Sequence, residues 1–175
     1  MKSKSITFDK YMPILSIQDG VVVSKRGELT VGWEVSLPCM CALTEEGYEG
    51  LLEAFSSAVR TLGPGYIVHR QDIYLKDIYK ADTHEGFLGS CYEQHFDGRQ
   101  HLTHRQYLFL TKALKDAPSR AISASGAFGI SIPKGELLAK DLATLMSKAS
   151  EFASVITSRG GYSLKRLDEI GRAHV

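Results

Sequence analysis

The sequence predicts an α+β domain: a mostly antiparallel sheet with helices packed on one face, of ferredoxin-like character. Residues 29–37 alternate strictly between apolar and other side chains, which indicates a strand with one buried face. Residues 44–62 and 136–157 instead repeat their apolar side chains at helical spacing. Stretches rich in β-branched and aromatic residues lie between these two helices, so strands and helices interleave along the chain.

The first expected element is an antiparallel hairpin. Residues 21–23 are three valines that precede the alternating strand, and Lys25-Arg26-Gly27 supplies a short turn with glycine where φ is positive. Asp19-Gly20 is a second turn signal. Residues 14–17 are therefore expected to add a short strand before it.

The two long helices have clear end signals. Thr44 is the expected N-cap of the first helix, with acidic residues in its first turn, and Gly63-Pro64 ends it. Gly160-Gly161 ends the second helix. The apolar side chains of each helix fall on one face, which predicts that both helices cover the sheet.

The middle of the chain is expected to hold a strand at residues 66–76 and a short helix after a capping box at Asp82–Glu85. That helix runs to about His95 and would bury an apolar stripe of Phe87, Leu88, Cys91 and Tyr92. Residues 95–107, with the sequence HFDGRQHLTHRQY, then form a polar connection to a central strand. A further strand is expected near 127–132.

Composition limits the possible functions. The chain has 175 residues, with 21 Lys and Arg against 20 Asp and Glu, for a net charge of +1. This balance favours neither a basic nucleic-acid binder nor an acidic tail. Three cysteines without a C-x-x-C pair, no signal peptide and no long apolar run predict a cytoplasmic protein.

The predicted domain organisation has three parts. Residues 1–12 form an N-terminal arm, residues 13–160 a single α+β domain, and residues 161–175 a frayed or truncated tail.

No motif predicts catalysis. The chain lacks the G-x-x-x-x-G-K-[ST] run in which backbone N–H groups and a lysine hold nucleotide phosphates. Cys91 and His95 are i, i+4 neighbours, so a thiol–imidazole pair is geometrically possible, but a core cysteine beside a surface histidine is the simpler interpretation. We therefore predict no catalytic residue, no metal and no cofactor for this chain.

The stretch 95–107 admits three interpretations. Zinc would suit ligands of the Cys91, His95, His101 and His104 types, but their spacing matches no zinc signature. Nucleic acid would suit the basic and aromatic residues between 95 and 109. The favoured interpretation is a polar loop, which is a reasonable place for contact with a partner. The residues that would contribute to the nucleic-acid surface are Arg99, His101, His104, Arg105, Tyr107 and Phe109.

Three stretches together resemble a known family. They are ILSIQDGVVVSKRGELTVGWEVSLP, TEEGYEGLLEAFSSAVRTLGPGYIVHRQDIY and HLTHRQYLFLTK. These stretches resemble the N-terminal region of TraG-type conjugation ATPases of conjugative transposons, which are similar to the VirB-type ATPases of type IV secretion. The likeness spans most of residues 5–170 and rests on structural residues.

The resemblance implies a non-catalytic N-terminal assembly domain. Its partners would be channel proteins, the rest of the ATPase and sister subunits, at the inner-membrane secretion complex. ATP and Mg²⁺ would belong to a C-terminal ATPase domain outside this sequence. Two surfaces are candidates for partner contact: the hairpin edge around Lys25 and Arg26, and the stretch from His95 to Arg105 with Arg99, His101, His104 and Arg105. The alternative is a small nucleic-acid-binding module.

Overall fold

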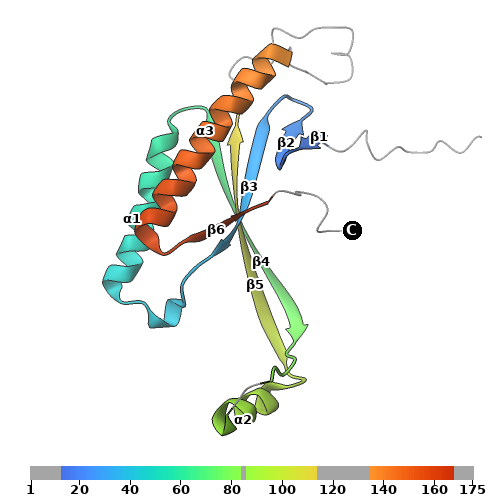
Figure 1. Cartoon of the computed structure of the whole chain (residues 1–175), viewed down its shortest axis with the longest axis vertical. Coiled ribbons are helices and arrows are strands. Elements are labelled where there is room, and N and C mark those ends of the chain that lie inside the picture. Colours follow the sequence, from blue (N-terminus) through green and yellow to red (C-terminus); the bar gives the residue numbers. More distant parts are fainter. Residues whose placement is uncertain (1–12, 84–85, 114–134, 168–175) are drawn as a thin grey trace, which may run out of the picture. The chain divides into compact units, whose positions relative to one another are not determined.

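The computed structural model describes residues 13–83, 86–113 and 135–167. It confirms the α+β class, with a six-stranded antiparallel sheet and three α-helices (Figure 1). The strands are β1 (Ile14–Gln18), β2 (Val21–Ser24), β3 (Leu29–Ser36), β4 (Tyr66–Ile78), β5 (Gln100–Lys112) and β6 (Ser163–Arg166). The helices are α1 (Glu45–Leu62), α2 (Phe87–Phe96) and α3 (Gly135–Gly160), with a short 3₁₀ helix at Met40–Ala42.

The ferredoxin-like character is visible in the strand order. The sheet runs β1-β2-β3-β5-β4, and β6 also pairs with β3. Without the β1–β2 hairpin and the α2 connection, the chain reads β3-α1-β4-β5-α3-β6 in the spatial order β6-β3-β5-β4. This is the β-α-β-β-α-β arrangement of ferredoxin-like domains.

Both predicted turns of the N-terminal hairpins are present. Asp19 and Gly20 have φ of 51° and 70°, and Gly27 has φ of 82°, a region that favours glycine. Ser24 Oγ accepts a hydrogen bond from the Glu28 N–H at 3.0 Å, which closes the second turn. Val21 then lies opposite Val31, so the alternating valines share one buried face.

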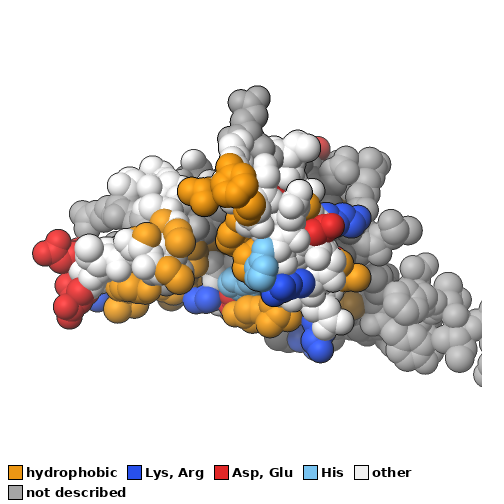
Figure 2. Space-filling view, turned by 90° about the horizontal axis from the view of Figure 1, so that it is seen from below, with side chains coloured by type: hydrophobic (Ala, Val, Ile, Leu, Met, Phe, Trp, Pro, Cys, Tyr) orange, Lys and Arg blue, Asp and Glu red, His pale blue; other side chains and the backbone are white. Residues whose placement is uncertain are grey.

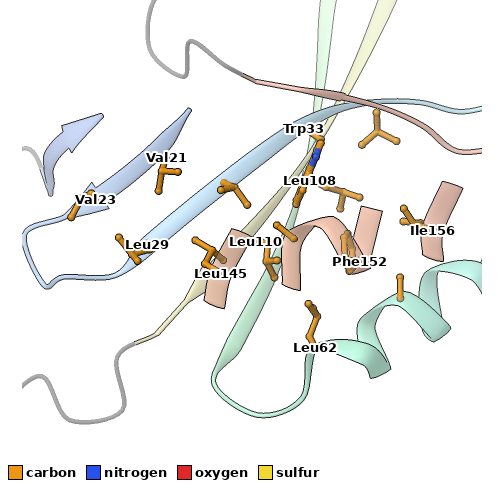
Figure 3. Close-up of a cluster of buried hydrophobic side chains, with 14 residues drawn as sticks. Val21, Val23, Leu29, Trp33, Leu62, Leu108, Leu110, Leu145, Phe152 and Ile156 are labelled. Carbon is orange, nitrogen blue, oxygen red and sulfur yellow. The ribbon is translucent and has the colours of Figure 1, made fainter. Parts of the chain in front are cut away.

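The two long helices cover one face of the sheet. The N-cap of α1 is Thr44, as predicted, and its Oγ1 accepts a hydrogen bond from the Gly47 N–H at 3.3 Å. Figure 3 shows side chains of β2, β3, β5, α1 and α3 pointing into a common core. The fully buried residues with the largest side chains are Phe152, Leu29, Leu110, Leu145, Ile156 and Val31.

The chain divides into two compact units. The first, called the core unit below, takes its described residues from Met1–Arg70 and Tyr107–Val175. The second, called the ribbon unit, is Gln71–Gln106. It contains the second half of β4, all of α2 and the first half of β5.

Three segments differ from the sequence prediction. Residues 100–106 belong to β5 instead of a polar loop, so the predicted connection shrinks to the turn at residues 97–99. Residues 163–166, expected in a frayed tail, form β6 and pair with β3. Gly86 is the N-cap of α2 and has no side-chain cap, so the N-cap lies one residue after the predicted capping box, of which Glu85 lies outside the described residues. The strand predicted near 127–132 lies outside the described residues.

Candidate interaction surface

The interior of the ribbon unit is polar. Within its described residues, 71–83 and 86–106, the only buried side chains are those of Glu93 and Gln106, each 6% exposed. Glu93 projects from α2 and accepts a hydrogen bond from the Tyr79 hydroxyl at 2.8 Å and another from the Asp82 N–H at 2.9 Å. One buried carboxylate therefore joins α2 to the segment that follows β4.

The turn after α2 adds further polar contacts. Asp97 Oδ1 accepts a hydrogen bond from the Ala81 N–H at 3.0 Å, and the Gly98 N–H donates to the Tyr79 carbonyl at 3.0 Å. The Tyr79 N–H in turn donates to the Arg99 carbonyl at 2.8 Å. These bonds hold the two ends of the α2 connection together.

Aromatic rings pack beneath this connection. The Phe96 ring meets the Tyr79 ring edge-on, with ring centroids 6.2 Å apart. The Arg99 guanidinium lies over the Phe96 ring, 5.7 Å from its centroid. Tyr79 also has a raised pKa, chiefly because its hydroxyl donates to the Glu93 carboxylate.

The outward face of α2 is apolar. Phe87 is 82% exposed, Leu88 81% and Tyr92 60%, and Cys91 is also exposed. The prediction that these four residues form a buried stripe is wrong, because the inward side of the helix is taken by Glu93. Figure 2, seen from below the view of Figure 1, shows hydrophobic, histidine and basic side chains on the surface.

The exposed apolar residues concentrate in the ribbon unit. Seven of the fourteen large hydrophobic residues that the structure exposes lie in this stretch of 71–106, although it is the smaller unit. Outside the helix, the strands contribute four of them: Tyr74, Leu75, Ile78 and Leu102. Exposed apolar surface that gathers in one place marks an interaction site more often than scattered residues do.

The basic residues predicted in 95–105 lie in the ribbon unit, but most of them contact neighbouring side chains. His104 Nε2 lies 2.8 Å from Asp72 Oδ1, and the His104 ring stacks on Tyr74 with centroids 4.5 Å apart. His101 Nε2 lies 3.3 Å from the Thr103 hydroxyl. Arg105 is exposed on β5. His101, His104 and Arg105 belong to the paired strand β5, so they do not lie in the predicted polar loop.

Lys25 and Arg26 lie elsewhere in the fold, in the turn between β2 and β3 of the core unit. The Lys25 N–H donates to the Pro13 carbonyl at 2.7 Å, and the Arg26 N–H donates to Ser24 Oγ at 3.2 Å. The six residues predicted to contact a partner therefore divide between two units.

The four residues considered as zinc ligands come from two elements. Cys91 and His95 are both exposed on α2, whereas His101 and His104 are on β5. Within the described parts of the chain, no three Cys, His, Asp or Glu side chains lie close enough to hold a metal ion.

The core unit has two other surface features. An open groove of about 350 Å³ lies between α1 and β4, with Phe55, Val59 and Val68 among its lining residues. On β5, Leu108 and Leu110 are buried, so the alternating residues Tyr107 and Phe109 face the other side of the sheet. The Tyr107 and Phe109 rings stack there, with centroids 6.4 Å apart.

The surface residues Phe87, Leu88 and Tyr92 were visible in the sequence as a helical stripe but were assigned to the core. One signal distinguishes them: the only charged residue of α2 is Glu93, on the opposite side of the helix. A surface helix usually places its charged residues in water and its apolar residues inside, whereas the charged residue of α2 is buried and its apolar residues are exposed.

Comparison with known proteins gives one partial match. Residues 1–52 match a family described as "Domain of unknown function, B. Theta Gene description (DUF3875)". This region covers the N-terminal strands and the start of α1. No curated protein matches the chain. Among the described helices, none has the length and apolar character needed to cross a membrane.

Proposed function

We propose that this chain is a non-catalytic assembly domain of a conjugative-transfer ATPase of the type IV secretion kind. In this proposal the ribbon unit docks the protein onto another component of the transfer apparatus. The core unit provides the stable base. The protein acts in the cytoplasm, against an inner-membrane secretion complex.

One observation carries the docking role. The ribbon unit buries two polar side chains in its described part and exposes Phe87, Leu88 and Tyr92 on one helix. Leaving such side chains in water loses roughly 1.5–3 kcal/mol per large residue relative to burial. A partner that covers this helix would recover that free energy, because exposed aromatic anchors dominate protein interfaces.

The resemblance described above supplies the biological setting. It covers most of residues 5–170 and contains structural residues only, which is compatible with a domain that assembles and does not catalyse. The family that matches residues 1–52 has no stated function, so it adds no activity to this proposal.

The proposal is tested by a mating experiment. The double variant Phe87→Ser/Leu88→Ser is placed in the full-length gene of a conjugative donor, and transfer frequency is measured. We expect transfer to fall at least about tenfold, because losing two interface anchors costs about 1.4 kcal/mol or more of binding free energy.

Leu52→Ser is the matched control. Leu52 is 67% exposed on α1 in the core unit, so the same kind of change is made outside the proposed surface. Unchanged transfer by the double variant, at normal protein level, would contradict the docking role.

A second candidate function is binding of single-stranded nucleic acid on the face of the core-unit sheet opposite α1 and α3. Tyr107 and Phe109 stack on that face, and the His69 and Phe109 rings lie 6.0 Å apart. Ring platforms on open sheet faces stack bases. The net charge of +1 gives this function little electrostatic support.

Fluorescence anisotropy separates the two candidates. A labelled single-stranded oligonucleotide is titrated with the chain at low salt, with Tyr107→Ser as the matched variant. Binding that the variant loses would favour nucleic acid, and no binding at low salt would remove this candidate.

A further inference from the structure

The ribbon half of β4, residues 71–78, has a free edge among the described strands. β4 is the last strand in the sheet order and pairs with β5 on one side. No proline interrupts this stretch, and most of its side chains are exposed. A long edge strand of this kind presents backbone N–H and C=O groups that another strand can pair with.

The register with β5 shows which backbone groups face that edge. The Tyr79 N–H donates to the Arg99 carbonyl at 2.8 Å, and the ring of Tyr74 stacks on that of His104. The residue numbers of each pair add to 178, which indicates one constant register between β4 and β5. In an antiparallel pair, alternate residues bond to opposite sides. The odd-numbered residues of β4 therefore bond to β5, and Asp72, Tyr74 and Lys76 direct their N–H and C=O groups outward, whereas the Ile78 N–H donates to Asp77 Oδ1 at 2.8 Å.

The side chains along this edge are complementary to themselves. If a second copy pairs antiparallel with its two-fold axis at Tyr74, Asp72 of each copy lies opposite Lys76 of the other. Ile73 lies opposite Leu75 in the same way, and Tyr74 meets its own equivalent. Opposite charges and apolar pairs directly across two strands are stabilising.

We infer that β4 residues 71–78 form a homodimer contact, in which two copies of this chain pair edge to edge about Tyr74. A two-fold contact of this kind uses the same patch on both subunits. The outward backbone N–H and C=O groups of residues 72, 74 and 76 face the same backbone groups of the second copy. The backbone hydrogen bonds and the side-chain pairs therefore favour the same register.

Neighbouring registers are worse. Moving the axis two residues along the strand, to Asp72 or to Lys76, places two like charges opposite each other. Moving it by one residue, to Ile73, places Asp72 opposite Tyr74 and separates it from Lys76. Charged residues on a sheet edge normally prevent association, but in the Tyr74 register Asp72 and Lys76 each lie opposite a residue of the other sign.

The contact deepens the proposed function, on which it rests for its biological setting, because it names a surface through which sister subunits meet. It uses the β4 edge and not the outward face of α2. Self-association and docking can therefore fail separately: the Phe87→Ser/Leu88→Ser variant would lose docking and still dimerise.

A charge-exchange experiment tests the contact. Sedimentation velocity is run on the wild-type chain, Lys76→Asp, Asp72→Lys and a one-to-one mixture of the two variants, at about 0.1–0.5 mM because the contact is small. Each variant alone places like charges opposite each other, and we expect its dimerisation constant to weaken at least about tenfold. In the mixture, two aspartates face two lysines, and we expect the dimer to return.

Asp77→Lys is the control, because in this register Asp77 lies opposite Gln71 and meets no charge. Circular dichroism checks that each variant is folded, since Asp72 also accepts hydrogen bonds from His104 and Gln106. A monomeric wild-type chain at these concentrations would overturn the inference. So would a mixture that stays monomeric, or equal weakening by Asp77→Lys.

Disulfide trapping tests the register without using charge. In a chain whose exposed Cys39, Cys41 and Cys91 are replaced by serine, Tyr74→Cys is oxidised with diamide. Directly opposed residues have Cα atoms about 5.5 Å apart, which suits a disulfide. We expect a covalent dimer from Tyr74→Cys and little from Leu75→Cys, which lies two residues out of register with its own equivalent. Equal trapping at both positions, or none at either, would contradict the contact at Tyr74.

Discussion

The core unit and the ribbon unit distribute polar and apolar side chains in opposite ways. The core unit buries Phe152, Leu110 and other apolar residues between its sheet and two helices. The described part of the ribbon unit buries Glu93 and Gln106 and exposes Phe87 and Leu88. Burial of apolar surface stabilises the first unit, whereas hydrogen bonds and strand pairing hold the second. The comparison teaches that a segment can keep one structure while leaving its apolar side chains available to a partner.

The largest expected effect is in the core unit. Phe152 is fully buried on α3 and its ring lies 5.9 Å from that of Trp33. Phe152→Ala should lower the free energy of unfolding by about 3–5 kcal/mol, through lost burial and the cavity left behind. Urea denaturation followed by Trp33 fluorescence measures this loss. A cost below about 1 kcal/mol would contradict the assignment of the core.

The next effect concerns close packing in the core unit. A Cβ atom added at Gly32 would lie 2.8 Å from Cδ1 of Phe109. Gly32→Ala should therefore cost about 1–3 kcal/mol by overpacking. Thermal denaturation measures the cost, and the further change Phe109→Leu should recover part of it. No recovery would mean that the ring of Phe109 is not the obstacle.

The ribbon unit should respond to loss of a carboxylate more than to loss of an apolar residue. Glu93→Ala removes the acceptor of hydrogen bonds from Tyr79 and Asp82 and should cost about 1–2 kcal/mol locally. Hydrogen exchange should accelerate within 71–106 and stay unchanged in α1 and α3. Glu93→Gln retains one acceptor oxygen and is the matched control. Uniform acceleration across both units would show that they do not behave separately.

The same hydrogen bond gives the ribbon unit a pH dependence. Glu93 holds the pKa of Tyr79 above the ordinary value of 10.0. Because the pKa of Tyr79 is higher in the folded chain than in the unfolded chain, the hydrogen bond stabilises the fold below pH 10. This stabilisation is lost as the pH rises through the folded pKa. Absorbance titration of tyrosinate should show Tyr79 ionising late together with Tyr162, whose pKa is raised by burial, and Tyr79→Phe should remove part of that late component. Loss of amplitude from the component that ionises near pH 10, with the late component unchanged, would contradict the bond.

The smallest expected effect is on the outward face of α2. Because Phe87 and Leu88 are about four-fifths exposed, Phe87→Ser/Leu88→Ser should change stability by no more than about 0.5 kcal/mol. Urea denaturation tests this against Phe152→Ala. A large loss would mean that the two side chains support the fold itself, and the loss of transfer expected of this variant could then not be assigned to docking.

The two units also differ in how far the sequence predicts them. The alternation in residues 29–37 and the N-cap at Thr44 led to the observed β3 and α1, because a half-buried strand and a sheet-covering helix both have a repeating apolar side. Residues 100–106 carry no such repeat, since most of their side chains are exposed in the strand. The start of β5 was therefore interpreted as a loop.

The apolar stripe of α2 shows a second limit. Helical spacing predicts that Phe87, Leu88, Cys91 and Tyr92 share a face, and they do, but spacing does not say what that face contacts. Because most such stripes are buried in their own domain, the sequence favoured a core position. Because Glu93 is the buried residue of α2, the apolar side of the helix faces outward. Glu93 bonds to Tyr79, which is too distant in the sequence for the pair to be recognised.

The most direct test of the docking role is site-specific photo-crosslinking in cells that are transferring DNA. A photoreactive amino acid is placed at Phe87 in the ribbon unit, and at Leu52 in the core unit as a control. The proposal predicts that Phe87 crosslinks to another identified component of the transfer apparatus and that Leu52 does not. No crosslink from Phe87, or the same products from both positions, would contradict the role of the ribbon unit as the docking surface.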